Sequence, residues 1–405
     1  MNVLFIFSRH SRDQRDSTLT KDLADAFYNA GHNITVATLL EKRENKETSL
    51  SNEHGYDVLR IKTGNYFNVG KVEKGITVLT LAKTLRAGII NQIGARKFDL
   101  IITHTPFVAN HKIIKPLKKH FNCPAFLLLW DLFPQNAVDL GIIKNSFLIK
   151  YFQKQEKLTF EIYEQIFCTS PGNVNYLKIN YPYIDQNKIN LQYNYATVKP
   201  IPSTSKSNIR HELGYSSDDV IALFGGNMGV PQKLENMIKL AQNASHLSNA
   251  KFLFIGSGTE TERIKTIAVT LALNNIKFIN QLSREDYEII SSVCDLGLVS
   301  LDERFTIPNF PSKTADYFKL QLPILASLDS CAAQDYGYFL TNIARAGRFA
   351  LAGDSGELFN RYMELYSDSG LRKELGFNGR KFYEDKLDVN IACRRICEQI
   401  DLIRT

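Results

Sequence analysis

Short apolar runs alternate with longer amphipathic stretches in the first third of the chain. Residues 3–7 form an unbroken apolar run, which predicts a buried strand. Residues 19–30 repeat apolar side chains at helical spacing. We expect further strands at 34–37, 56–61, 98–102 and 125–129, and helices at 76–93 and 107–121, the latter broken near Pro116. This alternation favours a parallel sheet with helices on both faces.

A second run of the same alternation follows a joint at residues 193–207, where Pro200, Pro202 and several hydroxyl residues interrupt the pattern. Strands are expected at 220–224, 251–255, 276–279, 296–300 and 323–326, and helices at 234–244, 260–273, 284–293, 312–320 and 390–403. The pattern predicts an α/β protein with two doubly wound units. Ligands bind such sheets at the carboxyl ends of the strands, and two facing units would form a cleft.

Composition narrows the class of protein. The 405 residues are 44% hydrophobic and 22% charged, which excludes a disordered or fibrous chain. No apolar run approaches the roughly 18 residues that cross a bilayer, and the first run lacks a signal-peptide pattern, so we expect a cytoplasmic protein. Cys393 and Cys397 share one face of a predicted helix, but the nearby sequence offers no histidine. We therefore interpret all six thiols as buried or idle and expect no metal.

Two glycine turns follow predicted strands of the second unit. Gly226, Asn227 and Gly229 lie in the first, where backbone N–H groups could approach a phosphate and Lys233, in the first turn of the next helix, could add charge. A tight strand–helix turn explains this motif equally well. The second turn begins at Gly256, and Thr261 stands where a dinucleotide fingerprint needs glycine. A hydride-transfer enzyme of the ordinary Rossmann type is therefore not expected.

Residues 305–317 end at a predicted helix start. Ser312 is a natural N-cap, Lys313 lies in the first turn, and Asp316 follows on the same face. A phosphate-binding lysine would then lie beside a carboxylate that accepts hydrogen bonds from sugar or ribose hydroxyls. A simple capping arrangement with an acid in the first turn is the alternative.

Two polar side chains follow strands of the first unit. Asp131 could orient or deprotonate a sugar hydroxyl, although it could equally cap a helix or fix a loop. His104 is a similar group with a structural role as its alternative. No Asp-x-Asp pair occurs, which excludes that device for clamping a nucleotide diphosphate through a divalent metal.

Four short motifs in this order and spacing resemble family 4 of the GT-B glycosyltransferases, nearest to the bacterial O-antigen, capsule and colanic-acid type. They occupy residues 31–36, 131–141, 224–229 and 311–326, so that the resemblance covers nearly the whole chain. It implies a GT-B fold of two Rossmann-like domains facing across a cleft. The domains would be residues 1–195, with a C-terminal helix at 388–405 packing back on them, and 196–387.

The resemblance implies retaining transfer of a sugar from a nucleotide-sugar donor, usually a UDP-sugar, without a metal cofactor. Lys233 and Lys313 would hold the diphosphate, Asp316 the ribose, and the backbone near Gln281 and Leu282 the base. Asp131 occupies the strand end where relatives carry a catalytic histidine or aspartate. The acceptor would be a lipid-linked saccharide of the undecaprenyl-pyrophosphate type at the cytoplasmic face of the inner membrane, with no nucleic-acid partner.

The sequence departs from the family at the donor-sugar contact. Pro308 stands where the family carries its first glutamate, so backbone groups around Asn309 would have to take over that contact. Two alternatives follow. The chain could be a UDP-sugar 2-epimerase, which shares this architecture and needs no acceptor, or a non-catalytic nucleotide-sugar-binding partner of another transferase.

The net charge of +7 is unevenly distributed. Residues 1–200 hold 26 Lys and Arg against 17 Asp and Glu, whereas residues 201–405 hold 23 against 25. The surplus is densest at four lysines, namely Lys112, Lys115, Lys118 and Lys119. A solvated helix face explains them, but so does docking of the acceptor-side domain to an anionic membrane.

Overall fold

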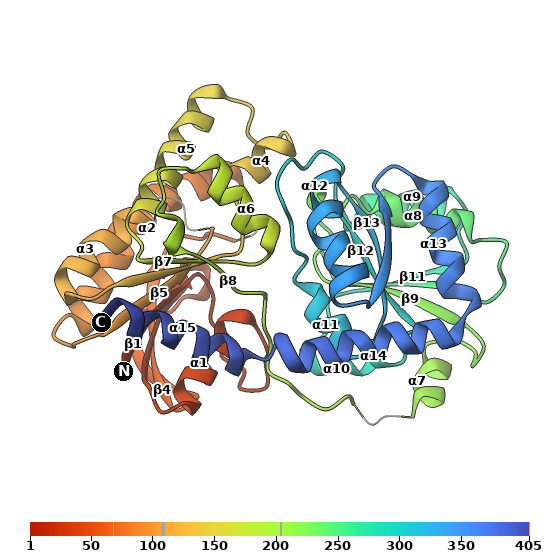
Figure 1. Cartoon of the computed structure of the whole chain (residues 1–405), viewed down its shortest axis with the longest axis horizontal. Helices are drawn as coiled ribbons and strands as arrows, with labels where there is room; N and C mark the ends of the chain where they lie inside the picture. Colours follow the sequence, from red (N-terminus) through yellow and green to blue (C-terminus); the bar gives the residue numbers. More distant parts are fainter. Residues whose placement is uncertain (68, 107–109, 203–204, 405) are drawn as a thin grey trace. The chain divides into compact units, whose positions relative to one another are not determined.

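A computed structural model describes residues 1–67, 69–106, 110–202 and 205–404. The chain forms two compact units (Figure 1). Unit 1 comprises Met1–Thr197 together with Val389–Thr405, and unit 2 comprises Val198–Asp388.

Unit 1 is built on a sheet whose described strands run in the order β3-β4-β2-β1-β5-β6-β7-β8. All neighbours pair in parallel except β3 and β4, which are antiparallel at one edge. The strands are β1 (Asn2–Phe7), β2 (Asn33–Glu41), β3 (Ser49–Glu53), β4 (Tyr56–Thr63), β5 (Leu100–His104), β6 (Ala125–Leu129), β7 (Gln165–Cys168) and β8 (Ile189–Leu191). The central strands are buried along almost their whole length, as expected of a sheet covered on both faces.

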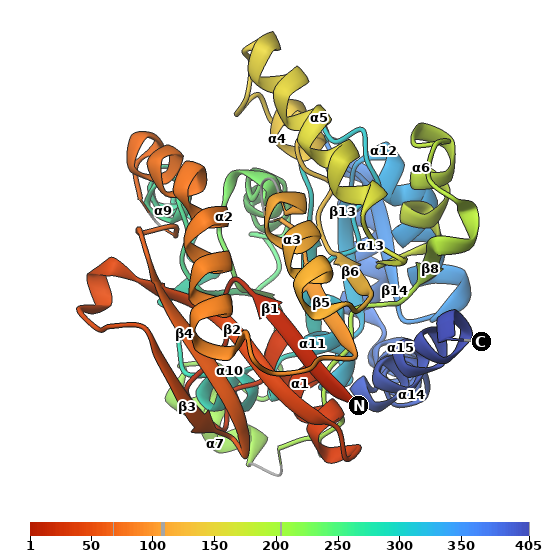
Figure 2. The same cartoon turned by 90° about the vertical axis from the view of Figure 1, so that its left-hand side faces the viewer.

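The helices of unit 1 are α1 (Leu19–Asn29), α2 (Lys71–Ile93), α3 (His111–Phe121), α4 (Gln135–Asp139), α5 (Ser146–Glu161), α6 (Pro171–Asn180) and α15 (Val389–Arg404), with short 3₁₀ turns at Lys42–Glu44 and Gln186–Lys188. Helix α15 comes from the far end of the sequence and lies beside α1 (Figures 1 and 2). Its residues Ala392, Ile396 and Ile400 are fully buried in one cluster with Leu23 and Phe27 of α1. The core of unit 1 therefore needs both ends of the chain.

Unit 2 is built on a parallel sheet in the order β11-β10-β9-β12-β13-β14. Its strands are β9 (Val220–Gly225), β10 (Ala250–Ile255), β11 (Ile276–Ile279), β12 (Leu296–Ser300), β13 (Ile324–Leu328) and β14 (Gly347–Leu351). Its helices are α7 (Lys206–Glu212), α8 (Glu235–Asn243), α9 (Thr261–Thr270), α10 (Arg284–Ser292), α11 (Lys313–Lys319), α12 (Ser330–Ala332), α13 (Ser355–Ser367) and α14 (Ser369–Lys386), with a 3₁₀ turn at Val230–Gln232 and two π-helical segments at Ala333–Gly337 and Phe339–Ile343.

These two sheets confirm the predicted α/β fold class. The sequence pattern was wrong about helix α3, which continues through Pro116. Ile113, Ile114, Leu117 and Phe121 are buried on both sides of that proline and hold the helix against the core. The predicted start of this helix at 107–109 lies outside the described residues. In the described part of the chain, no helix is long and apolar enough to cross a membrane.

Candidate functional site

The two glycine turns of unit 2 interlock at the carboxyl ends of β9 and β10. The Gly226 N–H donates to the Ile255 carbonyl at 2.9 Å, and the Met228 N–H donates to the Ser257 carbonyl at 3.0 Å. A Cβ at Gly256, whose φ is +142°, would lie 2.0 Å from the Gly226 oxygen, and one at Gly258 would lie 2.4 Å from Met228. Only glycine permits this approach, which fixes the exposed backbone of Gly226 and Asn227 at the strand ends.

Tyr317 of α11 holds the start of the first glycine turn through its hydroxyl group. Its hydroxyl accepts the Gly225 N–H at 3.1 Å and lies 3.1 Å from the Leu223 carbonyl and 3.0 Å from the Leu298 carbonyl. The paired residues of β9 and β12 end at Leu223 and Gly297, so the hydroxyl satisfies backbone groups where the two strands diverge. A side chain at Gly297 would meet the Tyr317 ring at 2.5 Å.

Lys313 occupies an unusual place for a cation. Its Nζ donates to the Gln232 side-chain oxygen at 2.9 Å and lies 3.7 Å from the centre of the Phe224 ring. No carboxylate among the described residues forms an ion pair with it. Burial of the ammonium lowers the pKa of Lys313 to about 7, and Asp316 offsets this only in part. The group is therefore a half-buried amine whose charged form is disfavoured by burial.

Asp316 lies on the same helix but is bound to Arg284 of α10. Arg284 also contacts Glu288 at 2.7 Å, and Glu288 pairs with Lys319 at 2.6 Å. These two carboxylates raise the pKa of Arg284 despite its burial. One carboxylate oxygen of Asp316 is thus engaged in an ion-pair network inside unit 2. The side chain is partly exposed, so its other oxygen could accept a hydrogen bond from a ligand hydroxyl.

Two sequence expectations at this site were wrong in detail. Lys233 does not lie in the first turn of α8, because it adopts a left-handed conformation before the helix begins, with φ +39°. Its Nζ pairs with Glu303 at 3.2 Å. Ser312 stands at the N-cap of α11, but its side chain makes no capping hydrogen bond because its backbone is helical rather than extended.

The other predicted donor contacts lie around the glycine turns or on the loop before α11. Gln281 is exposed, and its side-chain oxygen accepts a hydrogen bond from Ser257 at 3.3 Å, next to the second glycine turn. Leu282 is half-buried and precedes α10. Asn309 lies on the loop before α11, and its amide donates to the Ile307 carbonyl at 3.2 Å. The roles of these residues stay predictions.

In unit 1, His104 ends β5 and is 3% exposed. The Ser8 N–H donates to its Nε2 at 3.1 Å, and its Nδ1 donates to the Thr105 carbonyl at 2.6 Å. Its ring stacks on Trp130 at 4.4 Å. Burial lowers the pKa of His104 to about 4, so the imidazole is neutral near pH 7. These contacts favour a positioning role beneath the loop that carries Asp131.

Asp131 is exposed at the carboxyl end of β6. Its backbone N–H and that of Trp130 both donate to the Thr105 hydroxyl, at 2.9 and 3.0 Å, so His104 and Asp131 belong to one cluster. It caps no helix, because Pro134 is the N-cap of α4. Desolvation by the surrounding protein raises the pKa of the Asp131 carboxyl to about 6, although part of the residue is exposed to solvent.

The chain resembles known proteins in its amino-acid sequence. No family model matches the chain. It is 24% identical over 252 residues to the probable glycosyltransferase WbjE of Pseudomonas aeruginosa, a match that covers 59% of each chain. It is also 24% identical over 370 residues to the uncharacterized glycosyltransferase MJ1178 of Methanocaldococcus jannaschii, which covers 88% of this chain and 90% of that one.

Solved structures resemble the whole chain. The sucrose-phosphate synthase of Thermosynechococcus elongatus aligns with a TM-score of 0.78 at 17% identity, covering 100% of both chains. Anabaena Alr3699/HepE in complex with UDP-glucose aligns at 0.70 and 14% identity, covering 99% of both. WaaG, a glycosyltransferase involved in lipopolysaccharide biosynthesis, aligns at 0.66 and 13%, covering 98% of this chain and 99% of that one.

These likenesses show the GT-B fold, and both curated relatives carry the name glycosyltransferase. The family 4 assignment and the O-antigen type rest on the motifs alone and stay predictions. The matched region spans about three fifths of the length of WbjE.

Three residues at or next to the candidate donor site could not be identified from the sequence motifs. Gln232 contacts Lys313 from 81 residues away in the sequence. Arg284 contacts Asp316 from 32 residues away. Asp302, two residues past β12, is fully buried. Burial would raise the pKa of its carboxyl, but hydrogen bonds from Arg304 outweigh this and lower it. Its position directly after a strand was the available signal, as it was for Asp131.

The lysines of α3 are not equivalent. Lys112, Lys115 and Lys119 are exposed. Lys118 instead donates to the Ile162 carbonyl and to Glu164 at 2.6 Å. The ammonium of Lys118 is therefore engaged inside unit 1. Only the other three of the four predicted lysines present their charge to solvent.

Replacing Gly256 with alanine tests the interlocked turns. We expect Gly256→Ala to destabilise unit 2 by more than Gly353→Ala, a matched control with φ +90° and nothing within 4 Å of the added Cβ. The control costs about 1–3 kcal/mol from backbone strain alone. Urea unfolding of both variants measures the difference, and equal losses of stability would show that the contact with Gly226 is not limiting.

Proposed function

We propose that this chain transfers a sugar from a nucleotide-sugar donor, most specifically a UDP-sugar, to a saccharide acceptor with retention of configuration. The observation that carries the proposal is Lys313, a half-buried amine beside the interlocked glycine turns, with Gln232 and the Phe224 ring as its contacts. A buried cation without a paired carboxylate suits an anionic ligand. A diphosphate would supply the missing negative charge.

The glycine turns complete such a donor site. The Gly226 N–H is already bonded to the Ile255 carbonyl, so in the first turn the exposed Asn227 would offer its backbone N–H to a phosphate. Alr3699/HepE is described with UDP and with UDP-glucose, and the Escherichia coli trehalose-6-phosphate protein with UDP-2-fluoro glucose. These neighbours support a UDP-sugar donor. We propose that the second unit holds it, with Asp316 and Arg284 near the ribose and Gln281 and Leu282 near the base.

The reaction is proposed to need no metal, because lysine and backbone N–H groups would balance the diphosphate. Asp131 is proposed to orient or deprotonate the acceptor hydroxyl, since a carboxyl with a pKa near 6 is a base at neutral pH. A UDP-sugar 2-epimerase would convert the donor without an acceptor, and a non-catalytic partner would bind it unchanged. Release of UDP only when an acceptor is present distinguishes transfer from both.

Replacement of Lys313 tests the donor site. We expect Lys313→Ala to weaken UDP binding about 10- to 100-fold, because hydrogen bonds to charged groups contribute about 1.5–3 kcal/mol. Lys239→Ala is a matched control, since Lys239 is exposed and its Nζ likewise donates to a glutamine side chain, at 3.0 Å. Calorimetric titration with UDP measures both.

The same titration has a pH signature. An anion favours the charged form of Lys313, so UDP should bind most tightly below pH 7 and more weakly as the pH rises above the pKa of about 7. Lys313→Ala should lose this dependence. Equal affinities in Lys313→Ala and the unmodified chain would remove Lys313 from the donor site.

The pH profile of sugar transfer tests Asp131. If its carboxylate is the base, kcat should fall as the pH falls through about 6, where the group becomes protonated. Asp131→Asn should lower kcat by about 10²- to 10⁴-fold and leave donor affinity unchanged. Asp139→Asn, on α4, serves as the nearby control and should retain near-normal turnover. A flat acid limb in the unmodified protein would contradict the assignment.

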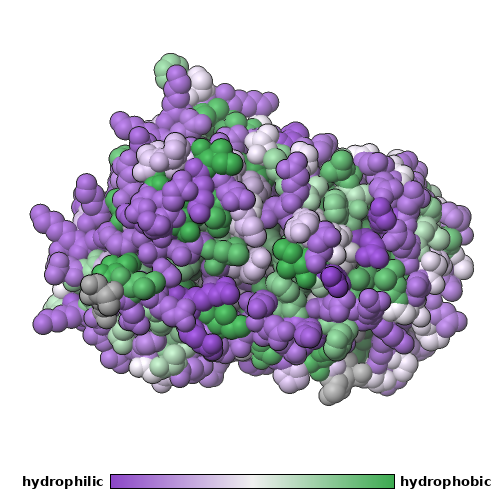
Figure 3. Space-filling model, in the orientation of Figure 1, coloured by the Kyte–Doolittle hydropathy of each residue, from purple (hydrophilic) through white to green (hydrophobic). Residues whose placement is uncertain are grey.

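We further propose that unit 1 docks on an anionic membrane to reach a lipid-linked acceptor. In addition to the α3 lysines, unit 1 exposes apolar side chains on the segment around α5. Phe147 is 82% exposed, and Ile142, Leu148 and Tyr151 are also exposed. Lys144, Lys150 and Lys154 are exposed on the same segment. Apolar residues are visible among polar ones over α5, at the top of Figure 3. Apolar side chains flanked by lysines suit the interface of a bilayer with acidic headgroups.

Vesicle binding separates the two surfaces. A Phe147→Ser/Leu148→Ser double variant should weaken sedimentation with vesicles containing anionic lipid, because it removes apolar area that inserts below the headgroups. A Lys112→Glu/Lys115→Glu/Lys119→Glu variant should weaken it through charge, and more strongly at low salt. Neutral vesicles are the control for both variants. Unchanged binding of both to anionic vesicles would remove unit 1 as the docking surface.

A further inference from the structure

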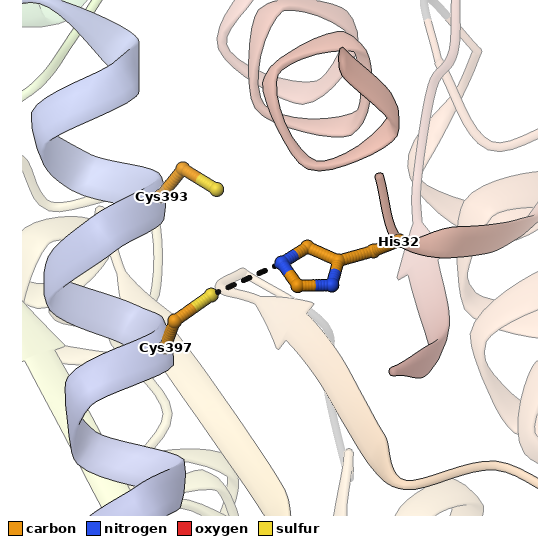
Figure 4. Close-up of side chains that lie close together, drawn as sticks. All are labelled: His32, Cys393 and Cys397. Atoms are coloured by element: carbon orange, nitrogen blue, oxygen red, sulfur yellow. Dashed lines mark hydrogen bonds between the residues drawn. The ribbon is translucent and has the colours of Figure 1, made fainter. Parts of the chain in front are cut away.

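A histidine and two cysteines meet in unit 1, away from the strand ends discussed above. His32 lies 3.5 Å from Cys397, measured from Nε2 to Sγ, and the ligand atoms of His32, Cys393 and Cys397 all lie within 4.8 Å of one another. Figure 4 shows both sulfur atoms on one side of α15, turned toward the imidazole. The sequence alone hid this cluster, because His32 is 365 residues from Cys397.

The backbone holds all three residues in fixed positions. Cys393 and Cys397 are one turn apart on α15, and Cys393 is buried in the cluster that joins α15 to α1. His32 lies in the turn between α1 and β2, where its N–H donates to the Phe27 carbonyl at 3.1 Å and Gly31 adopts φ +83°. The amino group of Met1 lies 3.3 Å from Nδ1, so Nε2 is the nitrogen that faces the sulfurs.

We propose that His32, Cys393 and Cys397 bind a zinc-type divalent cation that ties α15 to the turn after α1. Bond lengths of about 2.3 Å to sulfur and 2.0–2.1 Å to nitrogen place tetrahedral ligand atoms about 3.5–3.8 Å apart. The 3.5 Å contact already has this separation, and the 4.8 Å limit leaves only small side-chain rotations for the third ligand. Three protein ligands leave the fourth position for water.

A disulfide fits these positions less well. Residues four apart on a helix have Cβ atoms about 5–6 Å apart, whereas a disulfide needs about 3.5–4.5 Å. A metal ion bridges the longer separation without distorting α15, and it also explains the imidazole directed at the sulfurs.

The position of the cluster indicates a structural role. His32 precedes β2, so the cluster lies at the amino ends of the parallel strands, whereas His104 and Asp131 lie at their carboxyl ends. The cation would therefore stabilise the attachment of α15 and take no part in sugar transfer. Metal binding and folding are coupled in such sites, since the ligands come together only in the folded chain.

Cobalt spectroscopy of the tag-free, reduced full-length chain tests the proposal. Titration with Co²⁺ should give thiolate-to-cobalt charge-transfer absorption and tetrahedral visible bands that saturate at one ion per chain, and added Zn²⁺ should abolish both. Cys393→Ser, Cys397→Ser and His32→Ala should each weaken Zn²⁺ binding at least about tenfold, as the loss of even an outer-shell partner does. Cys331→Ser, at a half-buried cysteine of unit 2, should bind as the unmodified chain does.

Thermal unfolding provides the second measurement. Zn²⁺ should raise the unfolding midpoint of the unmodified chain and of Cys331→Ser, but not that of His32→Ala. If a variant fails to fold, the cobalt spectrum of the unmodified chain decides. The proposal is overturned if that spectrum lacks thiolate charge transfer, if the three ligand variants bind Zn²⁺ normally, or if the reduced chain forms a Cys393–Cys397 disulfide in air while binding no metal.

Discussion

The close approach of two backbone turns governs the candidate donor site. Gly226 and Gly256 meet at a separation that no side chain permits, and two cross-turn hydrogen bonds hold them there. The Tyr317 hydroxyl also fixes the first turn, because it forms hydrogen bonds with backbone groups where β9 and β12 diverge. The result is a rigid rim at the strand ends, on which Gly226 and Asn227 are exposed. A site that recognises phosphate through the backbone needs such rigidity, because each N–H must already point at the ligand.

The charged groups around this rim are of two kinds. Arg284, Asp316, Glu288 and Lys319 neutralise one another in a connected network, which positions α10 and α11. Lys313 stands apart from it, with an amide and an aromatic face as its contacts. Burying a cation with so little compensation costs free energy, and this burial lowers the pKa of Lys313. Strongly shifted pKa values are common in catalytic and ligand-binding sites.

The sequence predicted the fold well because strand–helix alternation is a local property. Strands at 125–129, 276–279 and 296–300 have the predicted bounds, as the uniformly apolar β6 illustrates. Helices α4–α6, α13 and α14 were missed. Among these, α6 and α14 have weak amphipathic patterns, and glycines interrupt α14. Glycine turns and Lys313 could be found from motifs. Gln232, Arg284 and the His32 cluster could not, because each depends on a contact between residues far apart in the sequence.

The route of the chain through its two units affects the order in which they are made. Unit 2 is encoded entirely between the two segments of unit 1, and α15 supplies Ala392, Ile396 and Ile400 to the core that contains β1 and α1. A ribosome therefore completes unit 2 before it releases the helix that closes unit 1. Until then the apolar face of α1 with Leu23 and Phe27 has no cover from α15. The core of unit 1 is therefore completed only once α15 has been synthesised, and the apolar face that α15 covers is open to aggregation until then.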